Sequence, residues 1–415
     1  MIKRLTILGM LLLLAAVSAC VQTPATLEPE SAPTTPAAQV QPTDTQTQPT
    51  PTFTALPPTE IPELSPTAEQ SPAPGGGSSP EGEVIAQPAL TFIDMKDESA
   101  GWGLMGAQVL LTADGGASWV DVSPEELGSE SLPSAYFLDA ARGWVLSADP
   151  GNPESGQIFR TADSGASWET LEAPFGFAQL TFLDAETGWA LVDRGAGAGS
   201  QAVDIYRSQD GGASWEPVFQ MAPEEPDQPG ALPLSGIKSG IRFSDAEHGW
   251  IGGSIPMDGF TYLYASADGG VTWQHVELPL PAGFENAQTT VEAPLFFNSQ
   301  EGVLPVTLFS DTLAMVFYTT EDGGATWTPG AVTENSGPHS VGSPQDFYVW
   351  GENGLSASHD GGATWESLQP EPDLREILGT LEFAGPARGW ALTMDLEGNS
   401  LLYHTRDGGA TWESE

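Results

Sequence analysis

The sequence is poor in the residues that build metal and disulfide sites. It has one cysteine, Cys20, so no intramolecular disulfide and no cysteine-based metal site can form. Its five histidines are scattered and give no local metal-ligand spacing. After residue 20, no stretch sustains apolar residues at three- and four-residue spacing, which excludes long amphipathic helices. We therefore expect no metal, no cofactor and a fold made of strands.

Basic residues are also scarce. Twelve Lys and Arg stand against 56 Asp and Glu, which gives a formal net charge of −44. Such a surface repels phosphate backbones and anionic lipid headgroups, so we expect no nucleic-acid partner. Solubility accounts for the acidity most simply and favours a monomer, and recruitment of cations or of a basic partner is the alternative.

The N-terminus has the pattern of a signal peptide. Residues 1–20 begin with two basic residues, continue with an apolar run too short to cross a bilayer comfortably, and end in small residues before a cysteine. Val17-Ser18-Ala19-Cys20 resembles the bacterial lipobox, in which the cysteine thiol takes the diacylglycerol. We expect a lipid anchor on Cys20 and a location on the extracytoplasmic face of a membrane. A plain signal peptide with an incidental cysteine is the alternative.

The next segment, residues 21–88, is rich in Thr, Pro, Ser, Gln and Ala, and 15 of its 68 residues are proline. A chain of this composition cannot bury enough apolar surface to offset its conformational entropy. We therefore predict a disordered linker that holds the rest of the chain away from a membrane.

One eight-residue pattern, Ser/Thr-x-Asp-x-Gly-x-Ser/Thr-Trp, then occurs seven times, and we call each copy an Asp turn. Successive copies begin 38 to 58 residues apart, a period typical of propeller blades. The aspartates are Asp114, Asp163, Asp210, Asp268, Asp322, Asp360 and Asp407. The tryptophans are Trp119, Trp168, Trp215, Trp273, Trp327, Trp365 and Trp412.

The residue types of the Asp turn predict a structural role. Aspartate can accept backbone N–H groups across its own turn, and the invariant glycine allows a positive φ. The tryptophan opens the next strand, where its ring can be buried against a neighbouring sheet. We therefore interpret these residues as parts of the fold and not as a ligand stack.

A second element precedes each Asp turn and reads Phe-x-Asp, a short gap, then Gly-Trp and apolar residues. Phe182 to Trp189 and Phe243 to Trp250 are examples. Repeat five has Gly302-Val303 in place of Gly-Trp, and repeat six has the divergent Phe347–Trp350. Each unit therefore reads as four antiparallel strands. The prediction is an all-β, seven-bladed β-propeller of four-stranded antiparallel blades over residues 89–415. Whether residues 83–87 add a strand that closes the ring stays open.

The Asp turn resembles the Asp-box, or BNR, repeat of sialidases, sortilin-type receptors and several glycosidases. Its combination with Phe-x-Asp and Gly-Trp looks more like the photosystem II stability/assembly factor family. That resemblance covers residues 89–415 and implies a non-catalytic protein that binds membrane-protein subunits. Members of that family use basic patches, whereas this chain has few arginines, which puts the same partner in doubt. Propellers of this kind host many unrelated functions.

Two sets of residues are candidates for a binding site. Aligning the first strands on their Phe places Tyr136, Thr181, Arg242 and Glu382 at one equivalent position, which would line the central channel. Pairing with neighbouring blades is the alternative role for these side chains. Length variation is confined to loops expected on one face, which predicts that face as the binding face. These loops are Asp149–Gln157, Asp193–Asp204, Met221–Gly236, Ser254–Gly259 and Leu278–Thr290.

The sequence gives little support to an enzyme. A sialidase needs three arginines converging on a carboxylate, but only eight arginines follow residue 20, most of them at repeat-specific positions, and the Arg-Ile-Pro motif is absent. We name no catalytic residue. The favoured function is a membrane-tethered scaffold that binds a protein, such as a membrane-protein subunit, or a glycan. The alternative is a cell-surface glycoside hydrolase or lyase that uses a carboxylate pair.

Overall fold

A computed structural model describes residues 82–127, 134–149, 151–222 and 228–414, which belong to the compact unit Pro74–Glu415. The predicted signal peptide, its Cys20 and most of the predicted linker lie outside the described residues. Every regular element within those residues is a β-strand, which agrees with the all-β prediction. The described segments contain no helix of the length and apolarity that a membrane crossing requires.

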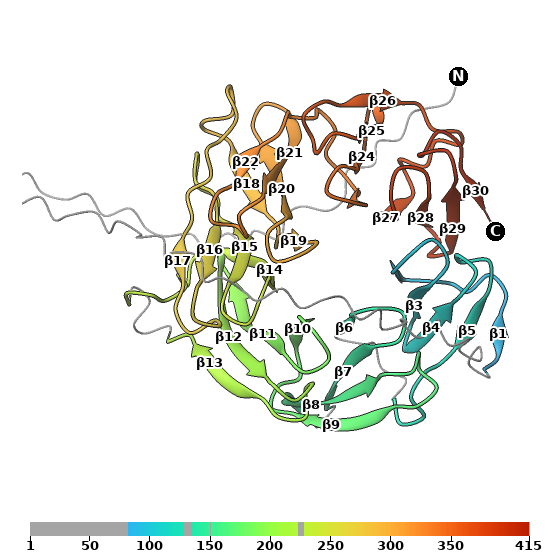
Figure 1. Ribbon diagram of the computed structural model, residues 1–415, viewed down its shortest axis with the longest axis vertical. Helices are drawn as coiled ribbons and strands as arrows, with labels where there is room; N and C mark the ends of the chain where they lie inside the picture. The colour runs from blue at the N-terminus through green and yellow to red at the C-terminus, as the bar shows by residue number, and fades with distance from the viewer. Residues whose placement is uncertain (1–81, 128–133, 150, 223–227, 415) are drawn as a thin grey trace, which may run out of the picture. The chain divides into compact units, whose positions relative to one another are not determined.

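The strands form antiparallel sheets that follow the sequence repeats, which we number 1 to 7 in chain order. Within Pro74–Glu415 the sheets succeed one another around a common centre (Figure 1). Repeat 1 contains β1 (Val84–Ile85), β2 (Phe92–Met95), β3 (Gly101–Met105), β4 (Gln108–Thr112) and β5 (Trp119–Asp121). Repeat 2 contains β6 (Ser134–Phe137), β7 (Gly143–Asp149), β8 (Asn152–Thr161) and β9 (Glu169–Ala173).

The middle repeats have the same strand order. Repeat 3 contains β10 (Ala178–Phe182), β11 (Gly188–Gly197), β12 (Ser200–Ser208) and β13 (Glu216–Gln220). Repeat 4 contains β14 (Ile237–Phe243), β15 (Gly249–Ser254), β16 (Leu263–Ser266) and β17 (Gln274–His275). Repeat 5 contains β18 (Gln288–Val291), β19 (Leu295–Phe296), β20 (Gly302–Phe309), β21 (Leu313–Thr320) and β22 (Thr328–Pro329).

The last two repeats complete the unit. Repeat 6 contains β23 (His339–Val341), β24 (Phe347–Gly351), β25 (Gly354–Ser358) and β26 (Glu366–Leu368). Repeat 7 contains β27 (Leu378–Phe383), β28 (Gly389–Met394), β29 (Ser400–Thr405) and β30 (Glu413–Ser414).

Three details depart from a plain four-stranded repeat. Strand β1 pairs with β5, so the residues before 89 extend the outer edge of their own repeat, and repeat 7 has its own outer strand, β30. The first strand of repeat 5 is split into β18 and β19, which both pair with β20. A single pair, Ser254 with Thr290, joins the sheets of repeats 4 and 5 into one.

All seven Asp turns have the same hydrogen bonds. One carboxylate oxygen accepts the backbone N–H of the second Ser/Thr at 2.8–2.9 Å, and the other accepts its hydroxyl at 2.6–2.7 Å. The first Ser/Thr hydroxyl accepts the N–H of the invariant glycine, whose φ lies between 79° and 99°. A side chain at that φ would be strained, which explains why glycine fills the position.

In every repeat except repeat 5, which has Val303 there, an aromatic residue near the start of the second strand links one repeat to the next. Trp144 stacks on Phe182 with ring centroids 3.8 Å apart, and Trp189 stacks on Phe243 at 3.7 Å. In repeat 6 the same place is taken by Tyr348, which stacks on the Phe of repeat 7 at 3.5 Å. Aromatic layers between adjacent sheets are therefore part of a core that also contains many aliphatic side chains.

The Asp turns give a first testable prediction. Partial burial opposes ionisation of Asp163, but hydrogen bonds from the Ser167 hydroxyl and N–H outweigh it and hold its pKa below 3.8. We expect Asp163→Ala to lower the free energy of unfolding by about 1–2 kcal/mol at neutral pH, because turn N–H and O–H groups lose their acceptor. Asp163→Asn, which keeps one acceptor oxygen, should cost less.

The pH dependence of this effect follows from the lowered pKa. The ionised, hydrogen-bonded carboxylate contributes stability above pH 3.8, the unfolded value, and this contribution is lost as the pH falls through the folded pKa. Denaturant unfolding at several pH values should therefore show wild type and Asp163→Ala converging in acid. A constant difference at all pH values would contradict the assigned role.

Candidate functional site

The structure places the candidate axial residues at one equivalent register position. Tyr136 in β6, Arg242 in β14 and Glu382 in β27 each lie opposite the tryptophan of the adjacent second strand. Thr181 in β10 has the same position. The sequence alignment on Phe therefore identified true structural equivalents, and their surroundings decide which of them share a site.

Arg242 is held in place by its two neighbours. Its Nη1 donates to the Thr181 hydroxyl at 3.2 Å, and its guanidinium carbon lies 5.6 Å from the centroid of the Tyr136 ring. The Tyr136 hydroxyl donates in turn to the Phe182 carbonyl at 2.9 Å. No carboxylate among the described residues forms an ion pair with Arg242, whereas five of the other arginines and lysines have such a partner.

A pocket of about 510 Å³, which we call the axial pocket, contains Arg242 and Tyr136. Lys96 brings a second cation, and its Nζ lies 2.6 Å from Asp94. The remaining wall is mainly apolar, and Leu295 and Phe297 are exposed there. The other lining residues are Leu138, Phe182, Leu183, Phe243, Ser244, Phe296, Asn298 and Ser299. The pocket thus combines two cations with apolar side chains.

The axial pocket lies on the face that carries the short turns. Much of its lining comes from turns between first and second strands, such as Leu138 and Asn298. The Asp turns bind these same turns, because Gly115 N–H donates to the Ser99 carbonyl at 2.7 Å and Gly323 N–H to the Gln300 carbonyl at 2.8 Å. The pocket therefore opens on the constant-length face, whereas the sequence favoured the face of variable loops.

Glu382 does not line the axial pocket and instead contacts repeat 1. Its Oε2 accepts the Met95 N–H at 2.8 Å. Desolvation, reinforced by the nearby negative charge of Asp94, raises the pKa of Glu382 to about 8, although the Met95 N–H and Lys96 act in the opposite direction. This carboxyl is therefore largely protonated at neutral pH, and of the three candidates only Tyr136 and Arg242 come together.

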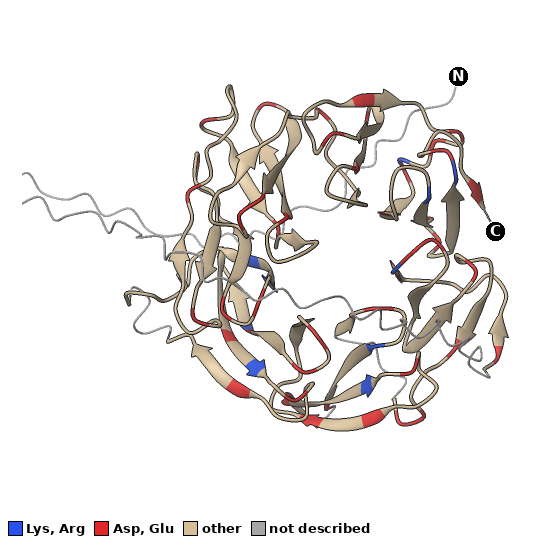
Figure 2. Ribbon diagram, viewed as in Figure 1, with Lys and Arg blue, Asp and Glu red and all other residues tan. Residues whose placement is uncertain are grey.

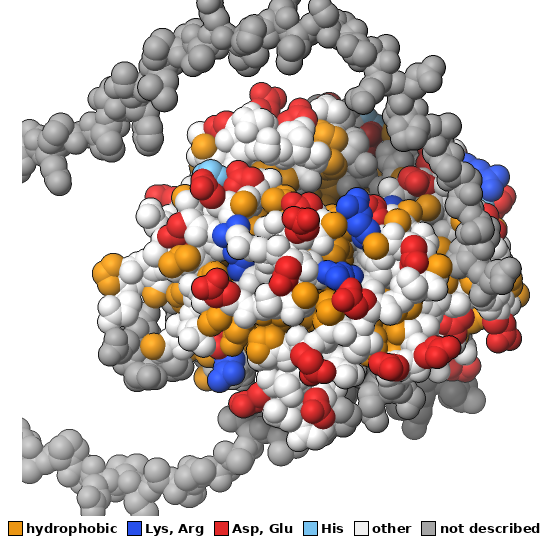
Figure 3. Space-filling view, turned by 60° about the horizontal axis from the view of Figure 1, so that its bottom comes forward, with side chains coloured by type: hydrophobic (Ala, Val, Ile, Leu, Met, Phe, Trp, Pro, Cys, Tyr) orange, Lys and Arg blue, Asp and Glu red, His pale blue; other side chains and the backbone are white. Residues whose placement is uncertain are grey.

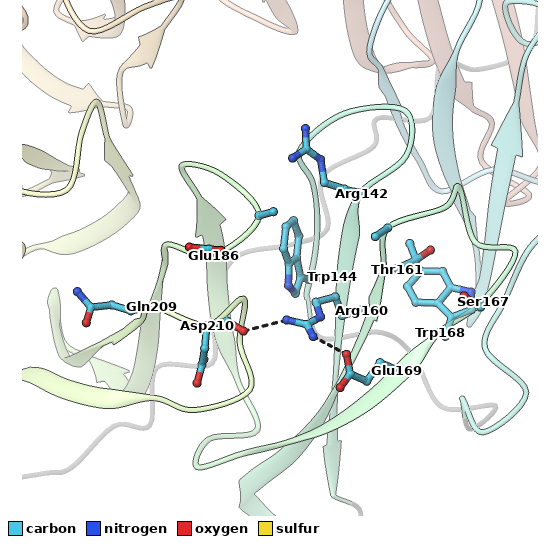
Figure 4. Close-up of a pocket in the computed structure, with 12 residues that line it drawn as sticks. Arg142, Trp144, Arg160, Thr161, Ser167, Trp168, Glu169, Glu186, Gln209 and Asp210 are labelled. Carbon is cyan, nitrogen blue, oxygen red and sulfur yellow. Dashed lines mark hydrogen bonds and ion pairs between the residues drawn. The ribbon is translucent and has the colours of Figure 1, made fainter. Parts of the chain in front are cut away.

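Outside the axial pocket, Lys and Arg side chains are few, and most of those in the described residues already bind a carboxylate or a backbone carbonyl. Figure 2 shows Lys and Arg at isolated places among many Asp and Glu, and Figure 3 shows acidic side chains spread over the visible face. Between repeats 2 and 3 a groove of about 700 Å³ contains Arg142 and Arg160 (Figure 4). Arg160 donates to the Asp210 carbonyl at 2.9 Å and forms an ion pair with Glu169. Its charge is thus already compensated.

Lys238 is a buried residue that the sequence analysis did not single out. Its Nζ donates to the carbonyls of Gln201 and Pro233, both at 2.8 Å, and lies 5.6 Å from the Tyr262 ring centroid. Burial lowers its pKa to about 8. The side chain fastens the segment before β14 to the β11–β12 hairpin. The one available signal was rarity, since only two lysines follow residue 20.

Neither a metal site nor a catalytic cluster emerges from these groups. Within residues 82–414, leaving aside the gaps in the description, no three His, Asp or Glu side chains are placed to hold a metal ion. What the axial pocket can do chemically is to bind a ligand that offers an anionic group next to apolar surface, because arginine and lysine would pair with the anion.

Comparison with known proteins gives similarity in fold only. No family model and no curated protein matches the chain. Among solved structures, YCF48 bound to D1 peptide is 19% identical with a TM-score of 0.50, covering 79% of this chain and 97% of that one. YCF48 from Cyanidioschyzon merolae is 16% identical with a TM-score of 0.51, covering 78% and 95%.

An enzyme matches equally well. The GH74 enzyme of Niastella koreensis is 14% identical with a TM-score of 0.52, and the match covers 80% of this chain but only 55% of the enzyme. At identities this low the matches concern the fold alone. Together with the ring of antiparallel sheets, they support a β-propeller.

Proposed function

We propose that the seven repeats are the blades of one propeller, tethered through a lipid on Cys20 to the extracytoplasmic face of a membrane. Contacts between the last and first repeats support the closed ring. The Trp390 indole N–H donates to the Gly115 carbonyl at 2.7 Å, and the Met95 N–H donates to Glu382. Ring closure thus uses side chains across the junction between repeats 7 and 1.

We propose further that this propeller is a non-catalytic scaffold that binds a protein segment in the axial pocket. The observation that carries this proposal is Arg242. In a chain with 56 acidic residues, its guanidinium has neighbours that fix its position but no carboxylate partner within the described residues. A partner that supplies a carboxylate would complete a charge-assisted pair.

The apolar side chains of the axial pocket and the charge of the whole chain indicate which class of partner fits. Leu295 and Phe297 are exposed beside Arg242 and would cover apolar side chains. The net charge of −44 repels a highly acidic partner, so a segment with an isolated carboxylate among neutral or apolar residues fits best. YCF48 bound to D1 peptide is a precedent for a propeller of similar fold that holds a peptide.

Glu382 favours a second function, a glycoside hydrolase. A carboxyl that stays protonated at neutral pH, close to a second carboxyl on Asp94, has the property of a general acid, and the GH74 enzyme has a similar fold. Two observations count against this function. The Glu382 carboxyl is occupied by the Met95 N–H, and it does not line the axial pocket.

The test is capture of a membrane-protein partner from detergent extracts by the full lipidated chain. We expect Arg242→Gln to reduce capture by at least about tenfold, because one charge-assisted pair contributes roughly 1.5–3 kcal/mol. Arg375→Gln is the matched control. It removes the same charge, but from an arginine on the surface that is paired with Asp373. Equal capture by Arg242→Gln and wild type would refute the axial site. Polysaccharide hydrolysis that Glu382→Gln abolishes would establish the second function instead.

A further inference from the structure

The junction between repeats 4 and 5 differs in its tryptophan from the junctions that follow repeats 1, 2, 3 and 7. In repeats 2, 3 and 7 the indole N–H of the second-strand tryptophan donates to an Asp-turn glycine carbonyl of the next repeat, at 2.7–2.9 Å. Trp250 is the corresponding residue of repeat 4 and is 3% exposed. Its Nε1 is buried and has no hydrogen-bond partner among the described residues.

The neighbouring side chains also differ at this junction. Trp250 is tilted by 38° to Phe296 with centroids 4.7 Å apart, whereas the rings of Trp189 and Phe243 are nearly parallel at 3.7 Å. The residue opposite Trp250 in the third strand is Ala265. In repeats 2 and 3 the same position holds arginine, and Arg160 reaches across to the next Asp turn. Alanine cannot make that bridge.

A groove of about 450 Å³ lies at this junction. Trp250 lines this groove, and the Asp turn of repeat 5 forms one wall. In repeats 2, 3 and 7 the equivalent indole N–H donates to the Asp turn of the next repeat. The rest is mostly amide, hydroxyl and imidazole, and neither Lys nor Arg belongs to it. The polar lining residues are Ser244, Asp245, His248, Ser266, Thr272, Gln274, His275, Ser299, Gln300 and Asp322.

Two imidazoles in the groove are already oriented. His248 lies with Nδ1 2.9 Å from Asp245, and His275 stacks on Phe260 with its Nε2 2.8 Å from the Thr261 carbonyl. These contacts fix the two rings in position, which pre-organises them for a ligand.

The chemistry of the groove selects a ligand class. A buried donor without an acceptor is costly, and a ligand hydroxyl would relieve that cost. Without a cation the groove does not attract anions, and without large exposed apolar walls it does not attract apolar peptide side chains. We propose that the groove between repeats 4 and 5 is a binding site for a neutral saccharide, with the Trp250 indole N–H donating to one of its hydroxyl oxygens.

This site goes beyond the proposed protein-binding function, because it uses neither Arg242 nor Lys96. The groove and the axial pocket share Ser244 and Ser299 in their linings, so the two sites are adjacent. A saccharide bound in the groove would lie beside the axial pocket. A variant at residue 242 tests the axial pocket and a variant at residue 265 tests the groove, so failure of one proposal can be distinguished from failure of the other.

The test is calorimetric titration of the full chain with neutral hexasaccharides built from glucose, xylose or N-acetylglucosamine. We expect at least one of them to bind with a Kd of about 1 mM or tighter. Ala265→Arg places in the groove the side chain that bridges the junction in repeat 2, and it should abolish binding. Trp250→Phe keeps the ring but removes the donor, and it should weaken binding about three- to tenfold. Arg242→Gln should leave binding unchanged.

Thermal unfolding supplies an independent readout. Both Trp250→Phe and Trp189→Phe remove part of a buried ring, but only Trp189 also loses a hydrogen bond, so Trp250→Phe should lower the unfolding temperature less than Trp189→Phe does. Should Ala265→Arg fail to fold, Gln274→Ala on the exposed groove wall replaces it and should also weaken binding. The proposal is overturned if no hexasaccharide binds, or if both Trp250→Phe and the groove variant bind as tightly as wild type.

Discussion

Trp189→Ala is expected to lower the free energy of unfolding by about 3–5 kcal/mol. The Trp189 side chain is completely buried and stacks on Phe243 of the next repeat. Its indole N–H donates to the Gly269 carbonyl at 2.9 Å. Truncation would leave a cavity between two sheets and an unsatisfied carbonyl, and the sheets are too constrained by their own ladders to close it.

Denaturant unfolding followed by far-ultraviolet circular dichroism measures this loss. Trp189→Phe is the matched control, because it keeps a ring on Phe243 and removes mainly the hydrogen bond, at a cost of about 1–2 kcal/mol. A loss below about 1 kcal/mol for Trp189→Ala would show that the aromatic layers are not the main link between repeats. Two separate transitions would show that the repeats unfold as more than one unit.

The local structure of the repeats could be predicted because its determinants lie close together in the chain. Within each Asp turn the aspartate, the hydroxyl residues and the glycine bind one another over a few residues, as Asp114 and Ser118 illustrate. The alternation of turns and apolar runs then predicts the antiparallel strands. The match of Tyr136, Arg242 and Glu382 in register followed from the same short-range pattern.

The features in which single repeats differ from the others could not be predicted, because they depend on residues far apart in the sequence. Trp250 lies in the same Gly-Trp pattern as Trp189, yet its indole N–H has no acceptor among the described residues and its ring is tilted to Phe296. The substitution of Tyr348 for tryptophan became evident only from its pairing with Ser340. The sequence pattern of one repeat does not indicate which residues of the next repeat it will contact.

Lys238 shows a different limit. Strand alternation places residues 242, 240 and 238 on one side of β14, towards the axis. A register shift between Lys238 and Gly240 inserts one extra residue, so Lys238 turns to the side of the buried Ile241. A single bulge reverses the direction of all side chains beyond it, and the sequence does not mark its position.

The predicted variable loops were also partly strands. Residues Asp193–Asp204 were expected to form a loop, but β11 runs to Gly197 and β12 begins at Ser200. The segment is rich in Gly and Ala, which have low strand propensity, and backbone pairing with the partner strand overrides it. The long hairpin gives Lys238 the Gln201 carbonyl that it binds.

Glu382→Gln is expected to change how stability depends on pH. The carboxyl has a pKa of about 8 in the folded chain and 4.5 as its ordinary value, so the folded state holds a proton that the unfolded state releases. For a raised pKa, stability is full below pH 4.5 and is lost as the pH rises towards 8. The loss amounts to about 5 kcal/mol, and the glutamine variant should escape it.

Glutamine keeps an oxygen for the Met95 N–H, so the variant tests the charge and not the hydrogen bond. The unfolding free energies of wild type and Glu382→Gln should coincide near pH 4.5. They should diverge as the pH rises, with Glu382→Gln the more stable. Glu397→Gln, in an exposed turn, changes the net charge equally and controls for general repulsion. Parallel curves for wild type and Glu382→Gln would mean that Glu382 is ionised in the fold.

The useful window for this comparison ends near pH 8 because of Lys238. Burial lowers the pKa of that ammonium to about 8, so the folded chain pays for its charge below this pH and recovers stability as the proton leaves between about 8 and 10.5. The two buried groups therefore act with opposite sign in adjacent pH ranges. A wild-type stability minimum close to pH 8, which Glu382→Gln makes shallower, is the combined result that we expect.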